Sequence, residues 1–149
     1  MWRPIPLPYV CERVIGYSIP RGDEFWVMSY EGLHRIVLAP AVSVWTDRSH
    51  AEDYDIYDTD RGLIEYEGMQ LWMLGLHGGD PVGNLPSGER LEWFEKEGLL
   101  RVTENEGRAL ADVGPFAVDD DWAYATFSVD GRYVVTATPD RLCVYRRDS

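Results

Sequence analysis

Cysteine, histidine and lysine are scarce in this chain, and each shortage excludes a class of protein. The 149 residues include two cysteines, three histidines and one lysine, Lys96. Two cysteines cannot build a disulfide scaffold, so Cys11 and Cys143 are expected to be buried thiols, which pair only if the terminal strands are neighbours. Lys96 lies between two glutamates, which makes it a poor candidate for a buried catalytic lysine.

Long apolar runs are also missing. The longest, residues 69–76, is interrupted by Gln70, whereas a membrane-spanning helix needs about 20 apolar residues. Residues 1–8 contain three prolines and lack the apolar core of a signal peptide. We therefore predict no membrane contact and a cytoplasmic location.

Positive charge is the third shortage. The formal net charge is −12, and residues 52–121 hold 18 acidic and 5 basic side chains, against 8 acidic and 9 basic ones elsewhere. Proteins that bind nucleic acid depend on lysine and arginine to neutralise phosphates, so this class is excluded. The acidic middle of the chain suits a basic protein partner, although solubility alone would also explain it.

The strongest positive signal is a hairpin pattern that occurs three times. An apolar, β-branched or aromatic run is followed by an acidic residue, a glycine and a second such run, in residues 27–38, 63–74 and 126–137. Glycine reaches positive φ without steric cost, so each copy predicts an antiparallel hairpin. The two Glu-Gly copies are weaker than Asp130-Gly131, because glutamate tolerates the left-handed region poorly.

These signals predict one domain, residues 1–149, that is mainly β with an α+β fold as the alternative. The alternating Pro4, Pro6 and Pro8 predict an extended arm over residues 1–9, which covers a sheet edge or contacts a partner. One short helix is expected near residues 87–97. Its signals are Ser87 as N-cap, an apolar stripe on the following turns and a stop at Gly98.

The third hairpin resembles a blade of a WD40- or YVTN-type β-propeller. The resemblance lies in Phe127-Ser128-Val129-Asp130-Gly131 with the apolar run after it, and in the final strand Leu142-Cys143-Val144-Tyr145. It implies a hairpin followed by a third strand. A closed propeller needs at least four blades of about forty residues each. We therefore expect a blade-like meander within a smaller antiparallel domain, and not a complete propeller.

Two acidic clusters, in residues 50–60 and 119–121, are predicted to contact a partner, with aromatic anchors and carboxylates that steer association. A solvated turn also explains either cluster, and more simply. The first cluster lacks the spacing of a calcium-binding EF-hand. The predicted partner-binding residues are Asp53, Tyr54, Asp55, Tyr57, Asp58, Asp60, Asp119, Asp120 and Asp121.

No motif for catalysis or cofactor binding is found. His34, His50 and His77 have no zinc-type spacing, and neither a serine nucleophile elbow nor a phosphate-binding loop occurs. We therefore assign no catalytic residue, no cofactor and no metal. If zinc were bound, these three histidines would be the first ligands to test.

The sequence predicts a small acidic protein-binding module. In size and charge the chain is similar to immunity proteins that cap a basic toxin, although no motif assigns it to them. The alternative is a domain that binds a small molecule or carbohydrate, with Trp45, Trp72 or Trp93 as stacking surfaces.

Overall fold

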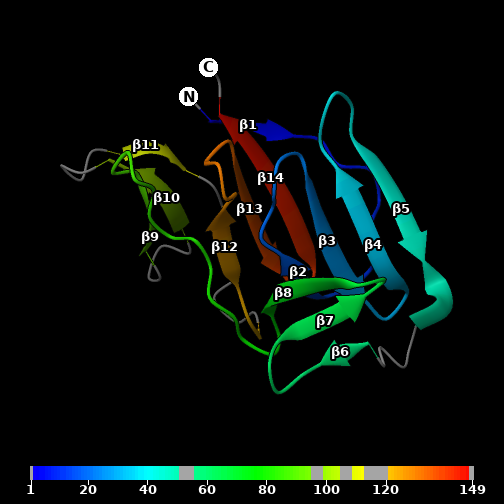
Figure 1. Ribbon diagram of the computed structural model, residues 1–149. Coiled ribbons are helices and arrows are strands. Elements are labelled where there is room, and N and C mark those ends of the chain that lie inside the picture. Colours follow the sequence, from blue (N-terminus) through cyan, green and yellow to red (C-terminus); the bar gives the residue numbers. More distant parts are fainter. Residues whose placement is uncertain (1, 51–55, 95–98, 105–108, 113–120, 148–149) are drawn as a thin grey trace.

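The computed structural model confirms a mainly β fold built from antiparallel sheets (Figure 1). The structure describes residues 2–50, 56–94, 99–104, 109–112 and 121–147. The strands are β1 (Trp2–Ile5), β2 (Val14–Ser18), β3 (Glu24–Ser29), β4 (Gly32–Val37), β5 (Ser43–Asp47), β6 (Tyr57–Asp58), β7 (Leu63–Tyr66), β8 (Met69–Gly75), β9 (Arg90–Phe94), β10 (Leu99–Thr103), β11 (Ala109–Asp112), β12 (Tyr124–Phe127), β13 (Tyr133–Thr138) and β14 (Arg141–Arg147).

The strands form three sheets. The largest has seven strands in the order β5-β4-β3-β2-β8-β7-β6, the second has four in the order β1-β14-β13-β12, and the third has three in the order β11-β10-β9. In the described part of the chain the sheets form no closed propeller, so the likeness of β12–β14 to a blade stays a resemblance. No helix in that part has the length and apolar character needed to cross a bilayer.

All three predicted hairpins are confirmed. Tyr30 and Glu31 connect β3 to β4, with Gly32 as the first residue of β4 opposite Ser29. Glu67-Gly68 lies between β7 and β8, and Asp130-Gly131 between β12 and β13, and each pair of strands is antiparallel. Glu67 itself has a φ of 48° and Gly68 one of 80°, so both residues of this turn have positive φ. A two-residue turn of this kind matches the twist of the flanking strands.

The prediction of a helix near residues 87–97 is wrong for residues 87–94, the part of this segment that the structure describes. Arg90–Phe94 forms β9, which pairs with β10 in a register that sets Leu91 opposite Val102 and Trp93 opposite Leu100. Isolated helices this short are marginal, so tertiary pairing decides the conformation of the segment. Among the described residues the only helix is the 3-10 turn Arg48–His50, between β5 and β6.

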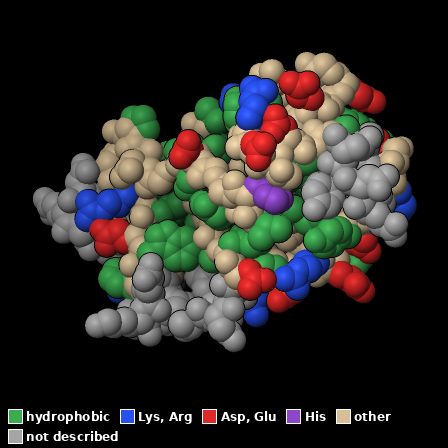
Figure 2. Space-filling model, turned by 90° about the horizontal axis from the view of Figure 1, so that it is seen from below, with side chains coloured by type: hydrophobic (Ala, Val, Ile, Leu, Met, Phe, Trp, Pro, Cys, Tyr) green, Lys and Arg blue, Asp and Glu red, His purple; other side chains and the backbone are tan. Residues whose placement is uncertain are grey.

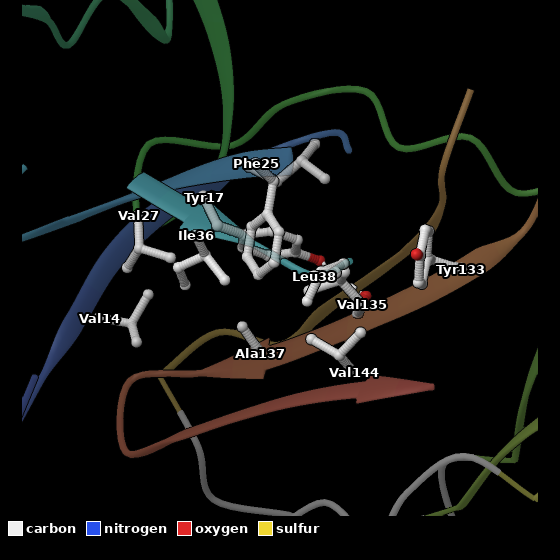
Figure 3. Packing of buried hydrophobic residues seen from close by; sticks show 11 residues of the cluster. Val14, Tyr17, Phe25, Val27, Ile36, Leu38, Tyr133, Val135, Ala137 and Val144 are labelled. Atoms are coloured by element: carbon white, nitrogen blue, oxygen red, sulfur yellow. Dashed lines mark hydrogen bonds between the residues drawn. The ribbon is translucent and has the colours of Figure 1, made fainter. Parts of the chain in front are cut away.

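The main core lies between the seven-stranded and four-stranded sheets (Figure 3). Side chains of β2, β3 and β4 face those of β13 and β14, and most of them are fully buried. Two hydrogen bonds also join this core's two sides, one of them fully buried. The Tyr17 hydroxyl donates to the Val135 carbonyl at 3.3 Å, and the Tyr133 hydroxyl donates to the Asp23 carboxylate at 2.6 Å.

Two further clusters of buried hydrophobic side chains pack outside the main core. The opposite face of β2–β4 carries Trp26, Met28 and Leu33, and residues of β6, β7 and β8 close over them. Trp2, Phe127 and Leu100 belong to a third cluster, between the four-stranded and three-stranded sheets. The N-terminal arm contributes through β1, which pairs with β14 and forms one edge of the four-stranded sheet.

Candidate functional site

The face of the seven-stranded sheet that points away from the main core is hollowed in two adjoining places. One hollow has a volume of about 350 Å³ and the other about 410 Å³, and both are lined by Glu24 and Trp26. We call the combined feature the tryptophan groove. Its principal residues are Glu24, Trp26, Arg35, Trp45, Arg61 and Trp72.

Strand register places three of these side chains in one row. Trp26 of β3 is opposite Arg35 of β4, and Arg35 is opposite Trp45 of β5. Directly opposite residues of antiparallel strands share a face, with alternate residues on the other side. Phe25 and Ile36, the neighbours along the strands, accordingly point into the main core.

The groove has a buried floor and exposed walls. Trp26 is 6% exposed, whereas Trp45 and Trp72 are 52% and 51% exposed. The floor is fixed, because the Trp26 amide donates to Ser18 Oγ at 2.8 Å and its ring centroid lies 5.7 Å from that of Tyr66. Seen from below, over β6–β8, hydrophobic side chains are exposed between separate acidic and basic ones (Figure 2).

Charges of both signs line the groove. Arg35 donates through Nε and Nη2 to Glu24 Oε2, at 2.9 and 2.6 Å, and the Arg61 guanidinium lies 5.9 Å from the centre of the Trp72 ring. The hydrogen bond from the Tyr66 hydroxyl to Asp47 raises the pKa of Tyr66 to about 12, so this phenol stays neutral at physiological pH. The site therefore offers aromatic faces, guanidinium donors and carboxylate acceptors.

Four of the nine predicted partner-binding residues lie in the described part of the structure. Asp53, Tyr54, Asp55, Asp119 and Asp120 lie outside the described residues.

Tyr57 is buried in the second cluster, with its ring centroid 5.2 Å from that of His77, so it presents no surface to a partner. Asp58 and Asp60 are exposed at the β6–β7 turn, where the Asp58 carboxylate accepts from the Arg61 amide at 3.2 Å. Asp121 is exposed beside the four-stranded sheet and pairs with Arg13 at 3.2 Å.

Two of the three tryptophans named as stacking surfaces line the groove. Trp72 lines the first hollow and Trp45 the second, whereas Trp93 lies in β9 of the three-stranded sheet. Sequence reasoning missed the contribution of the arginines. Alternation along the first hairpin could have placed Arg35 on the same face as Trp26, and the observed register sets the two residues directly opposite each other.

No family model, no curated protein and no solved structure matches this chain.

Proposed function

We propose that this protein binds another protein through the tryptophan groove. The observation that carries the proposal is the pair of half-exposed tryptophans, Trp45 and Trp72, on either side of the buried Trp26. Contiguous apolar surface rimmed by polar side chains marks interaction sites, and each of these tryptophans lines a hollow that also contains Glu24 and Trp26. Tryptophan and arginine are the residues most enriched among those that carry binding energy, particularly beside well-packed pockets.

Charge supports a basic partner. The net charge of −12 gives a long-range attraction for a basic protein, and Asp58 and Asp60 are exposed on the turn that leads to Arg61 in the groove. Such charges raise the encounter rate more than they raise affinity. The ion pair of Glu24 and Arg35, whose charges cancel, then offers hydrogen-bonding groups to the bound partner. An immunity or antitoxin-type inhibitor of a basic protein is the specific form of this proposal.

Binding of a carbohydrate or other small molecule is the second candidate. Volumes of about 350 and 410 Å³ fall within the usual range for small-ligand sites. Exposed tryptophan faces beside Gln70, Arg61 and Asp80 would pair ring stacking with hydrogen bonds to hydroxyl groups.

The test compares Trp45→Ala and Trp72→Ala with a matched control, Trp93→Ala, which removes a 41% exposed tryptophan outside the groove. A partner captured from the source organism and then purified should bind the two groove variants roughly 30-fold more weakly, about 2 kcal/mol each. The control should bind like the wild type. If both groove variants bind the partner as tightly as Trp93→Ala and the wild type do, the groove is rejected as the contact face.

Screening against a glycan library, followed through tryptophan fluorescence, separates the second candidate from the first. Sugar binding that is lost in Trp72→Ala, together with partner binding that is unaffected by it, would establish the small-molecule function instead.

A further inference from the structure

Three side chains of the kinds that bind metals meet at the turn end of the β3–β4 hairpin. Cys11 comes from the segment before β2, Glu31 from the hairpin turn and His34 from β4. One ligand atom of each lies within 4.8 Å of the other two. Zinc bonds of about 2.0–2.3 Å place tetrahedral ligand atoms about 3.5 Å apart, so a contraction of about 1 Å would complete the set.

The His34 ring is already held in an orientation that suits ligation. It is 1% exposed, with Nδ1 2.8 Å from Thr46 Oγ1 and Nε2 2.7 Å from Ser29 Oγ. Ser29 Oγ also hydrogen-bonds the Cys11 thiol and accepts from the Glu31 amide at 3.0 Å, so Nε2 is on the side of the other two ligands. A metal bound there would replace the Ser29 hydroxyl as the partner of Nε2. A metal-binding histidine usually donates its second ring N–H to an outer partner, and Thr46 is placed to accept it.

Glu31 is held in place by the N-terminal segment. Its carboxylate accepts from the Tyr9 hydroxyl at 3.1 and 3.2 Å and from the Glu12 amide at 3.3 Å. Cys11 lies between these two donors in the sequence. The contacts that fold this segment onto the hairpin therefore also bring the thiol to the imidazole.

The three side chains have the donor atoms that zinc takes in proteins: a thiol sulfur, a carboxylate oxygen and an imidazole nitrogen. A neutral imidazole is the form that binds metals, and a metal displaces the thiol proton. The thiolate and carboxylate would then balance the charge of a divalent ion.

We propose that Cys11, Glu31 and His34 bind one zinc ion, with the fourth position left to water. Sites with three protein ligands keep such an open position. The ion would tie the N-terminal segment to the β3–β4 hairpin. Arg35 follows His34 in β4 and faces the opposite side of the sheet, so this site is separate from the tryptophan groove. The sequence predicted no metal because the ligands have no zinc-type spacing.

Cobalt titration of chelator-treated protein tests the proposal. Wild-type protein should bind one Co²⁺ with a thiolate-to-cobalt charge-transfer band and the intense visible bands of tetrahedral coordination, and Zn²⁺ should displace it. Cys11→Ser should abolish the charge-transfer band, whereas the matched control Cys143→Ser should keep it. Glu31→Gln should weaken binding, whereas Glu67→Gln, at the turn of another hairpin, should not.

Thr46→Val tests the outer partner of His34 and should weaken metal affinity about 10- to 100-fold. Circular dichroism of each metal-free variant establishes that it is folded. Absence of the charge-transfer band from the wild type at stoichiometric Co²⁺ would overturn the proposal. So would a band that persists in Cys11→Ser or disappears in Cys143→Ser.

Discussion

At the scale of single residues, the glycines of the three hairpin signals serve different purposes. Gly68 and Gly131 supply positive φ to turns, at 80° and 78°. Gly32 has a φ of 135°, and a Cβ there would lie 2.2 Å from the Asp47 carbonyl oxygen. The first hairpin therefore needs glycine so that β5 can approach β4 closely, a requirement that arises between strands and is invisible in the hairpin pattern itself.

Alanine at positions 68 and 32 should separate the two roles. Gly68→Ala meets open space and should cost only the strain of positive φ, about 1–2 kcal/mol. Gly32→Ala adds a clash with backbone, so we expect a loss above about 3 kcal/mol. The free energy of unfolding in urea measures both. Equal losses would show that backbone strain alone explains the glycine at position 32.

His34 gives a stability that depends on pH. Its pKa is lowered to about 4 by burial, from 6.5. Between these values the unfolded chain binds more protons than the folded one, so stability is complete above pH 6.5 and is lost as pH falls toward 4. The loss is on the order of 3 kcal/mol.

We expect the ring protons of His34 to titrate near pH 4 in a metal-free NMR experiment. His34→Gln should then lose less stability than the wild type between pH 6.5 and 4, because the carboxylates titrate alike in both proteins. Parallel pH profiles for the two proteins would contradict this assignment.

At the scale of elements, β1 shows how a proline-rich segment enters a sheet. Pro4 has no amide to donate, but β1 is an edge strand, where proline is tolerated. The strand is fixed by Trp2, which is 7% exposed, lies 6.0 Å from the Phe127 ring and is covered by the Arg147 guanidinium at 5.0 Å. The arm is thus part of the fold, because its tryptophan completes the third cluster.

Trp2→Ala should therefore destabilise the protein by about 3–5 kcal/mol, the usual loss for a large buried aromatic side chain. Trp72→Ala, which removes a half-exposed tryptophan, should change the unfolding free energy by no more than about 0.5 kcal/mol. Urea unfolding of the two variants gives the comparison. A small effect of Trp2→Ala would mean that the N-terminal arm does not contribute to the core.

At the scale of the whole molecule, the acidic side chains are separate from the three buried clusters. Residues 52–121 carry most of the acidity, whereas the three clusters of buried side chains are apolar. Charge and fold are therefore separable. Neutralising the exposed Asp58 and Asp60 should leave the protein folded, since an asparagine at position 58 would retain an oxygen to accept from the Arg61 amide.

The variant Asp53→Asn, Asp55→Asn, Asp58→Asn, Asp60→Asn should associate more slowly with a basic partner and show a flatter salt dependence. Charges of this kind act on encounter, and a Debye length of about 8 Å at physiological salt screens them. Dissociation should change less. Stopped-flow mixing across a salt titration is the measurement. Unchanged association would leave solubility as the role of this acidic segment.

Local sequence signals were enough to predict the mainly β class and the three antiparallel hairpins. Acidic-Gly turns between alternating apolar runs act over a few residues, so Glu67-Gly68 and Asp130-Gly131 needed no distant contact to define their hairpins. The same local reasoning failed at residues 90–94. So short a segment forms no stable helix by itself, and it pairs with β10 as a strand instead.

The contacts between distant segments could not be predicted from these local patterns. The pairing of β1 with β14 and of β2 with β8 depends on how whole faces pack, and many pairings satisfy the same alternating pattern. The curvature that brings Tyr66 to Trp26 makes the tryptophan groove, and the fold of the N-terminal segment brings Cys11 to His34. These sites combine residues whose separation in sequence carries no signal, since their contacts arise from packing between sheets and loops.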